Sequence, residues 1–350
     1  MNRVDVADMK RSLPKGCPGV SSLPVETRPE FTLIEWIAQQ AGARSEVKLG
    51  IGDDAAVLAA SGQEWVVTTD VLTSGVHFLA ETPLRLVGRK AMAVNLSDLA
   101  AMGAEPCAAF VGIVLPRSYT REQSEQLYSG LFAMAHEFNV VIAGGDTNSW
   151  DGPLVISVTL HGLVPEGQAI CRQGARPGDW IFVTGALGGS FPSQRHLTFL
   201  PRVQEALILR NCVPLHAMLD LSDGLGSDLF HLLQRSQVGA VLDAAAIPIH
   251  PDVPAELNPE ERLQHALGDG EDFELLFCVS PESGTRLLEQ PVISIPLTKI
   301  GEITARRQVL MQTRDGNRPL FRSGWSHPLG TSAVSPRSVP APEIIPDVSG

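Results

Sequence analysis

Cysteine is scarce in this 350-residue chain, and its spacing is not that of a structural framework. The five cysteines are far apart, odd in number and include no C-x-x-C pair; they are Cys17, Cys107, Cys171, Cys212 and Cys278. This pattern argues against a disulfide-stapled domain and against a zinc site, and it favours buried, reduced thiols.

Long apolar runs and clusters of basic residues are also missing. No apolar stretch reaches the ~18 residues that span a bilayer, and the N-terminus lacks the apolar centre of a signal peptide. We therefore expect a cytoplasmic protein without a membrane partner. The chain has 27 Lys and Arg against 39 Asp and Glu, which gives a net charge of −12. Because nucleic-acid binders carry a basic surface, we expect no nucleic-acid partner.

The composition is that of a globular protein, with 44% hydrophobic and 19% charged residues. Its length predicts two domains. Residues 1–29 are predicted to be a flexible extension, and the Pro- and Ser-rich residues 330–350 a disordered tail. Between them strand-like and helix-like segments alternate, which predicts an α/β (α+β) fold. The Pro/Gly-containing stretch RQGARPGDW suggests a boundary between residues 30–170 and 171–329.

Aspartates stand at the ends of several strand-like segments. The runs EWVVTTD, VVIAGGD and AMLD are predicted to be strands that end at Asp70, Asp146 and Asp220. Ligands of α/β proteins bind where strand ends meet at one edge of a sheet, so we expect these carboxylates to converge.

Asp98 belongs to a helix predicted over RLVGRKAMAVNLSDLAAM and closed by Gly103. This helix is apolar on nearly every side and therefore predicted to be buried. A buried carboxylate needs a cation or hydrogen-bond donors to compensate it. A metal ion, a neighbouring loop, or pairing with Arg89 or Lys90 are the alternatives.

The other aspartates have simple structural explanations when taken singly. Asp223 could cap the helix that begins at Gly224, and Asp53, Asp54 and Asp146 could be turn residues. Taken together, so many carboxylates at strand ends and glycine turns favour an oxygen-only site for a hard cation such as Mg²⁺. Glycine-containing loops at 143–148, 183–190 and 221–227 offer backbone N–H groups to phosphates, although no P-loop, dinucleotide or protein-kinase motif is present.

A set of motifs occurs in one order over residues 50–277: GIGDDAAVL, TTDVLTSGVHF, GRKAMAVNLSDLAAMGAEP, AGGDT, RQGARPGDWIFVTGALGGS, DLSDGLGSDL and GEDFELLF. Together they resemble the thiamine-monophosphate kinase family, within the aminoimidazole ribonucleotide synthetase superfamily. The resemblance implies a two-domain fold whose N-terminal mixed sheet dimerises, followed by a C-terminal α/β domain. It also implies transfer of the ATP γ-phosphate to thiamine monophosphate, giving thiamine diphosphate, with several Mg²⁺ ions.

The site residues follow from the resemblance, position by position. The Mg²⁺ ligands implied are Asp54, Thr68, Thr69, Asp70, Asp98, Asp146, Asp220 and Asp223. The ATP contacts implied are Gly145, Asp146, Arg172 and Ser222, and the substrate contacts are His77, Glu271 and Trp325.

Elementary chemistry agrees with this assignment. A phosphate monoester is largely dianionic at pH 7, because its second pKa is ~6, so it needs no strong base to act as a nucleophile. The task is to bring two polyanions together, which cations and a forked Arg172 would do. Simpler roles remain open: an exposed linker arginine for Arg172, a structural histidine for His77 and a core plug for Trp325.

Two features limit the assignment. The segment at 190–203 is shorter than the resemblance leads us to expect, which affects the substrate wall more than the phosphate machinery. Because a fold does not fix its substrate, another ATP-dependent small-molecule phosphotransferase or synthetase of this superfamily is an alternative. A non-catalytic, metal-dependent nucleotide-binding dimer is another.

Overall fold

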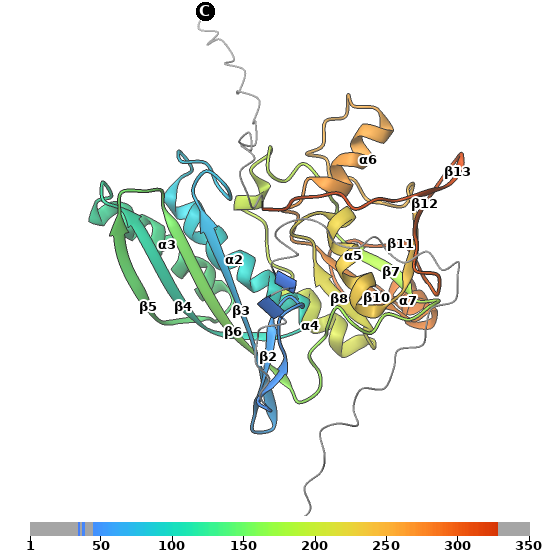
Figure 1. Cartoon of the computed structure of the whole chain (residues 1–350), viewed down its shortest axis with the longest axis horizontal. Helices are drawn as coiled ribbons and strands as arrows, with labels where there is room; N and C mark the ends of the chain where they lie inside the picture. The colour runs from blue at the N-terminus through green and yellow to red at the C-terminus, as the bar shows by residue number, and fades with distance from the viewer. Residues whose placement is uncertain (1–33, 36, 39–44, 328–350) are drawn as a thin grey trace, which may run out of the picture.

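The computed structural model describes residues 34–35, 37–38 and 45–327. The predicted flexible extension and disordered tail lie outside the described residues. Two sheets, each with its own helices, lie side by side in the described chain (Figure 1). A mixed α/β architecture is thus confirmed.

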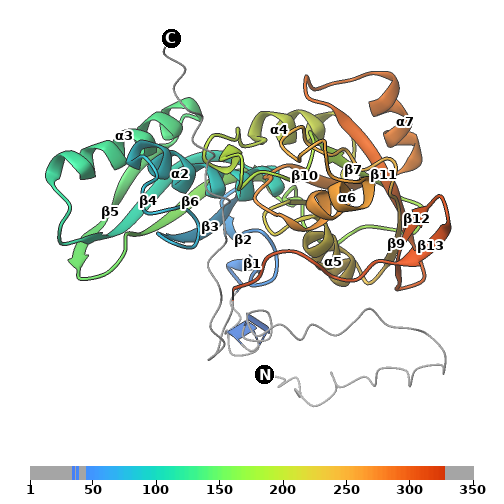
Figure 2. The same ribbon diagram turned by 90° about the horizontal axis from the view of Figure 1, so that it is seen from above.

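The first sheet has six strands in the order β1-β2-β3-β6-β4-β5. The strands are β1 (Val47–Leu49), β2 (Ala56–Ala60), β3 (Gln63–Thr73), β4 (Glu105–Pro116), β5 (Val141–Trp150) and β6 (Val155–Pro165). Only β4 and β5 pair in parallel; the other neighbours are antiparallel. Helices α2 (Leu84–Ala101) and α3 (Arg121–Glu137) lie on one face of this sheet; on the opposite face the short helical segment of residues 34–35 and 37–38 lies near β1, and no helix of the described chain covers β4, β5 and β6 (Figure 2).

The second sheet has seven strands in the order β13-β12-β9-β11-β7-β10-β8. They are β7 (Trp180–Thr184), β8 (Ala217–Asp220), β9 (Gly239–Asp243), β10 (Leu275–Val279), β11 (Leu297–Thr304), β12 (Val309–Thr313) and β13 (Gly316–Pro319). The helices of this half are η2 (Arg195–Leu197), α4 (Val203–Cys212), α5 (Leu225–Ser236), α6 (Pro259–Gly268) and α7 (Pro281–Glu289). Residues 166–179 connect the sheets, and the domain boundary near Cys171 stays a prediction within that connection.

Helix α2 is the central element, and it begins and ends close to the predicted residues. It contacts β3 and β6 of the first sheet, α3, and also η2, α4 and β8 of the second half. Gly88 and Gly130 let α2 and α3 touch, because a Cβ on Gly88 would lie 2.0 Å from the Leu127 carbonyl oxygen. Gly103, at φ +64°, takes the left-handed conformation that closes the helix. The all-round apolar surface of α2 is thus explained by neighbours on every side.

The predicted start of α3 is also confirmed. Thr120 accepts the N–H of Gln123, and the Gln123 side chain accepts the N–H of Thr120 in return. This reciprocal arrangement is the capping box that the spacing of the two residues predicts.

Two of the predicted strand ends are wrong. Asp70 and Asp146 lie inside their strands, because β3 continues to Thr73 and β5 to Trp150. The antiparallel ladder with β6 satisfies the backbone beyond Asp70, so a polar side chain there does not end the strand. Asp220 is the last residue of β8, as predicted.

No helix among residues 34–35, 37–38 and 45–327 combines the length and the apolar character that crossing a bilayer requires.

Candidate active site

A pocket opens between the two sheets and is lined from both. Its wall includes β3, α2, the end of β8 and the segments around residues 77, 271 and 325. Eight of the predicted site residues line it: Asp70, His77, Asp98, Asp220, Ser222, Asp223, Glu271 and Trp325. Residues far apart in sequence, assigned separately to metal, nucleotide and substrate, therefore face one space.

Three carboxylates form the acidic end of this site. Oxygen atoms of Asp54, Asp98 and Asp220 lie within 4.8 Å of one another. Asp54 comes from the loop before β2, Asp98 from α2 and Asp220 from the end of β8. We call this set the carboxylate triad. Such a group of hard oxygen donors from three elements suits a cation that takes oxygen ligands.

Neighbouring hydroxyls orient the triad. Thr68 Oγ1 donates to Asp98 Oδ2 at 2.5 Å, and Ser97 Oγ donates to Asp220 Oδ2 at 2.6 Å. The alternative partners of Asp98 are engaged elsewhere: Arg89 donates to the carbonyls of Leu197 and Phe199, and Lys90 to Glu271. The pairing of Asp98 with either basic residue is therefore wrong.

The triad is electrostatically costly. Burial, together with the carboxylates of Asp70, Asp220 and Asp54, raises the pKa of Asp98 well above its usual range. Burial and the Asp54 carboxylate raise the pKa of Asp220 to about 8. Burial raises the pKa of Asp70 to about 6, although a hydrogen bond with Asp98 and the Lys90 charge oppose the rise. A cation at this point would relieve the mutual repulsion.

Arg172 is part of the site and not an exposed linker residue. Its Nε donates to Asp54 Oδ2 at 3.0 Å and its Nη2 to Asp54 Oδ1 at 2.8 Å, a bidentate pair. The Arg172 backbone N–H donates to both oxygens of Asp53 at 3.1 Å. The adjacent aspartates thus divide their roles, since Asp53 fixes the backbone of residue 172 and Asp54 meets its guanidinium.

A second pocket is lined by both Asp54 and Arg172. Its wall is formed by the turn 50–56, by Thr68 and Thr69 of β3, and by His231, Gln234 and Arg235 of α5. Arg235 Nη2 donates to the Ile51 carbonyl at 3.3 Å. A basic end thus adjoins the acidic triad.

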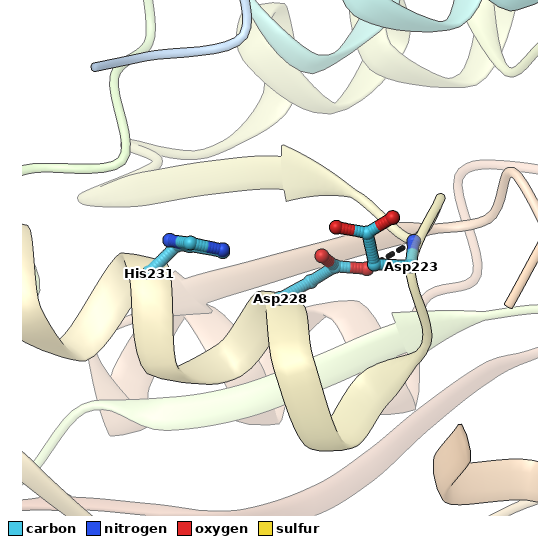
Figure 3. Close-up of side chains that lie close together, drawn as sticks. All are labelled: Asp223, Asp228 and His231. Carbon is cyan, nitrogen blue, oxygen red and sulfur yellow. Dashed lines mark hydrogen bonds between the residues drawn. The ribbon is translucent and has the colours of Figure 1, made fainter. Parts of the chain in front are cut away.

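A second cluster lies beside the triad, formed by Asp223, Asp228 and His231 (Figure 3). Their candidate ligand atoms lie within 4.8 Å of one another. Asp228 Oδ2 accepts the N–H groups of Asp223 and Gly224, and Gly224, which starts α5, supplies no side-chain cap; the cap at Asp223 stays a prediction. Sequence reasoning missed Asp228 and His231, although their i, i+3 spacing on α5 places them on one helix face.

The opposite end of the first pocket is aromatic. The His77 ring lies 5.3 Å from that of His327, and the Trp325 ring lies 5.9 Å from that of His327, edge on. His77 Nδ1 accepts the N–H of Thr73 at 3.0 Å, which leaves Nε2 as the N–H donor of a neutral ring. Burial lowers the pKa of His77 to about 4, and the nearby Lys90 charge contributes in the same direction.

Glu271 closes this aromatic end, on a strained segment. Glu271 and Phe273 both have positive φ, at 59° and 51°. Such conformations cost of order 1 kcal/mol for a non-glycine residue and gather at functional sites. Burial would raise the pKa of Glu271, but the Lys90 charge and the hydrogen bonds at its carboxylate lower it to about 2. Sequence reasoning did not find Lys90 or His196.

Three predicted residues lie away from the first pocket, although Thr69 lines the second. Thr69 points to the helix-free face of the first sheet, where its hydroxyl meets that of Thr159 at 3.0 Å. Gly145 and Asp146 lie on the edge strand β5 and are exposed. Across the ladder Asp146 is level with Val71, three strands away, which is about 14 Å at the usual strand spacing.

Known proteins share both the sequence and the fold. Residues 52–164 match the family model described as AIR synthase related protein, N-terminal domain. Thiamine-monophosphate kinase of Rhodopirellula baltica is 43% identical over 272 residues, covering 75% of this chain and 85% of that protein. The Escherichia coli K12 enzyme of the same name is 37% identical over 323 residues, covering 85% and 98%.

This chain belongs to the thiamine-monophosphate kinase family. As a member of that family it is an enzyme of the kinase class. Among solved structures, AaThiL complexed with AMPPCP and TMP has a TM-score of 0.74 at 30% identity, covering 85% of this chain and 96% of that one. The two-domain aminoimidazole ribonucleotide synthetase-like fold implied by the motifs is thereby confirmed.

Proposed function

We propose that this protein transfers the γ-phosphate of ATP to thiamine monophosphate and so forms thiamine diphosphate. One observation carries the proposal: a single pocket is lined by Asp98 and Asp220 of the carboxylate triad and by Glu271 with the rings of His77, Trp325 and His327. Thiamine monophosphate has the matching polarity, with a phosphate at one end and a cationic heteroaromatic ring system at the other. The names of the protein's relatives, and the similar structure of AaThiL complexed with AMPPCP and TMP, support the same substrates.

The residues of the chain would position the two substrates and neutralise their phosphate charge; they need not abstract a proton. The acceptor phosphate is largely a dianion at neutral pH and is already a nucleophile. His77 is neutral with its N–H at Nε2, and the aromatic rings of Trp325 and His327, which line the same pocket, would attract a cationic ring. The ring end of the acceptor would thus be held while its phosphate points at the triad.

The oxygen donors fit Mg²⁺. Asp54, Asp98 and Asp220 would hold one ion, with Asp70, Thr68 and Asp223 beside them for further ions. Mg²⁺ held by these residues would supply positive charge to neutralise the phosphates. The raised pKa values of Asp98 and Asp220 indicate negative charge that Arg172 compensates only in part, which favours a bound cation.

The ATP contacts remain part of the proposal. Arg172, which lines the second pocket with Asp54, has the forked guanidinium that suits phosphate oxygens, and Ser222 lines the first pocket. Gly145 and Asp146 lie too far away along the sheet of their own chain. We propose that they serve ATP at a site completed by a second copy.

The second copy would cover the helix-free face of the first sheet. Large apolar side chains are exposed there, among them Val71 at 52% and Phe110 at 43%. On the adjoining edge strand, Val141 is 65% exposed. An apolar face next to an unpaired strand edge is an association surface, and we propose a homodimer joined through these sheets.

The test is a turnover assay with purified protein, ATP, MgCl₂ and thiamine monophosphate, in which thiamine diphosphate is separated by chromatography. We expect product with Mg²⁺ and none with excess EDTA. Thiamine, which lacks the acceptor phosphate, is the matched control and should give no phosphorylated product. Failure to form thiamine diphosphate, while another small-molecule phosphate is phosphorylated, would contradict the substrate and leave the kinase class intact.

A further inference from the structure

One fully buried lysine lies at the meeting point of four segments around the pocket. Lys90 of α2 is 1% exposed, so its ammonium has lost its hydration. Burying such an ion costs several kcal/mol unless partners replace the water. Neither the family resemblance nor the motifs assign this residue a role.

The ammonium uses its donors on three different segments. It donates to the His77 carbonyl at 2.6 Å, to His196 Nδ1 at 2.8 Å and to the Glu271 carboxylate. An ammonium has three N–H groups, so these acceptors match its full capacity. His77 follows β3, His196 belongs to η2 and Glu271 precedes β10, and thus Lys90 ties the first sheet to the second at the ring end of the pocket.

The backbone of Glu271 is fixed independently of Lys90. Its N–H donates to the Ser222 carbonyl at 2.7 Å, and its carbonyl accepts Ser190 Oγ at 2.6 Å. These bonds hold the strained positive-φ conformation in place. They fix the main chain, but the direction and charge of the carboxylate depend on the groups around its oxygens.

Lys90 supplies that direction and charge. An anion buried at 7% exposure would take up a proton without a cation beside it. Only the ionised carboxylate attracts a cationic ring, and only a fixed one does so without losing side-chain entropy on binding.

We propose that Lys90 is a positioning residue that keeps the Glu271 carboxylate ionised and aimed at the ring end of the pocket, and so sets the affinity for a cationic heteroaromatic acceptor. The inference rests on the proposed function for its acceptor. The hydrogen bonds of Lys90 lie at the ring end of the pocket and its charge acts on Asp70 only through space, so nucleotide affinity should change far less than acceptor affinity.

The experiment measures binding by calorimetry for the full chain, with thiamine monophosphate and, separately, AMPPCP with Mg²⁺. In Lys90→Met, which keeps the stem and removes the charge, we expect thiamine monophosphate to bind at least about tenfold more weakly, the effect of losing one charge-assisted interaction. AMPPCP binding should change less than about twofold. Lys299→Met is the matched control, since Lys299 lies over the Trp180 ring and outside the pocket.

A double-mutant cycle separates positioning from a general structural role. Glu271→Gln should weaken acceptor binding, and Lys90→Met added to it should weaken binding little further, because Lys90 acts through Glu271. The proposal would be overturned if the fold-losses in affinity of the two single variants multiplied in the double variant. It would also be overturned if Lys90→Met bound thiamine monophosphate as tightly as the wild type. If Lys90→Met does not fold, Lys90→Gln replaces it with the same expectation. A wild-type protein that does not bind thiamine monophosphate would refute the proposed function as well, whereas tight wild-type binding with an unaffected Lys90 variant refutes this inference alone.

Discussion

Replacing Asp98 by asparagine should stabilise the metal-free protein and abolish its response to Mg²⁺. The substitution is nearly isosteric, and the oxygen of the new side-chain amide would still accept from Thr68 Oγ1, which donates at 2.5 Å in the wild type. What disappears is one charge of the carboxylate triad. Few substitutions at a functional site are expected to stabilise the protein. The sign of the change in stability is therefore a sharp test of the electrostatic reasoning.

The magnitude follows from the geometry. Two unit charges at 4.8 Å, the limit within which the triad oxygens lie, repel by about 3.5 kcal/mol at an effective dielectric of ~20. Arg172 and partial protonation already relieve much of this repulsion, so we expect a net gain of about 1 kcal/mol. For a chain of this length, that corresponds to a rise in Tm of roughly 2 °C.

The gain should depend on pH with a definite sign. The pKa values of Asp98 and Asp220, raised in the folded protein, mean that the folded state holds protons that the unfolded state releases. These two groups therefore cost the metal-free wild type stability as the pH rises from about 4 to about 8. Asp98→Asn loses less over that range, so its advantage should be largest near pH 8 and vanish near pH 4.

The assay is thermal unfolding in EDTA and in excess Mg²⁺, at several pH values, with turnover measured in parallel. Asp151→Asn is the matched control, because that exposed aspartate pairs only with exposed Arg117 at 3.1 Å and lies outside the triad. A variant less stable than wild type in EDTA at pH 8, or one that gains as much from Mg²⁺ as wild type does, would refute the reasoning.

Three further outcomes are expected. Mg²⁺ at a hundredfold excess over its Kd should stabilise the wild type by about 2.7 kcal/mol, more at pH 8 than at pH 5.5 because protons compete for Asp220, whose pKa is about 8; equal Tm shifts at the two pH values would contradict this. Phe110→Asp on the helix-free face, 43% exposed, should yield a monomer in light scattering, whereas Phe132→Asp on α3, 55% exposed, should leave the mass unchanged; a monomeric wild type would contradict the dimer. Leu99→Ala, at a fully buried position of α2, should lower the free energy of unfolding in denaturant by about 2–5 kcal/mol. Leu288→Ala on α7, where the side chain is 48% exposed, should change it by no more than about 0.5 kcal/mol. Similar losses in the two variants would contradict this packing.

Local patterns predicted much of the fold. The Thr120 and Gln123 spacing located the start of α3, and Gly103 located the end of α2. The apolar character of α2 on every side correctly predicted its burial. Such features depend on neighbours within a few residues, which a single sequence contains.

Polar residues inside strands were harder to interpret. Asp70 and Asp146 look like strand ends because aspartate is uncommon in strands. Their backbone partners on β6 and β4 come from distant segments, and these partners continue both strands. The pattern around each aspartate carries no trace of that pairing.

The site was predicted in part for the same reason. The motifs located the triad, but the partner of Lys90 is Glu271, 181 positions away. A lysine within an apolar helix is expected to extend its stem toward water. Only the meeting of α2 with the segment before β10 turns it inward.

Helix α2 also fixes the distance between Lys90 and Asp98. Lys90, which holds the ring end of the pocket, and Asp98, which belongs to the triad, are eight residues apart on one helix, a separation of ~12 Å along its axis. This buried helix is packed between the two sheets and has a fixed length. The proposed site should therefore select an acceptor by its length as well as by its charge. Lengthening or shortening the linker between ring and phosphate would leave one of the two ends out of reach.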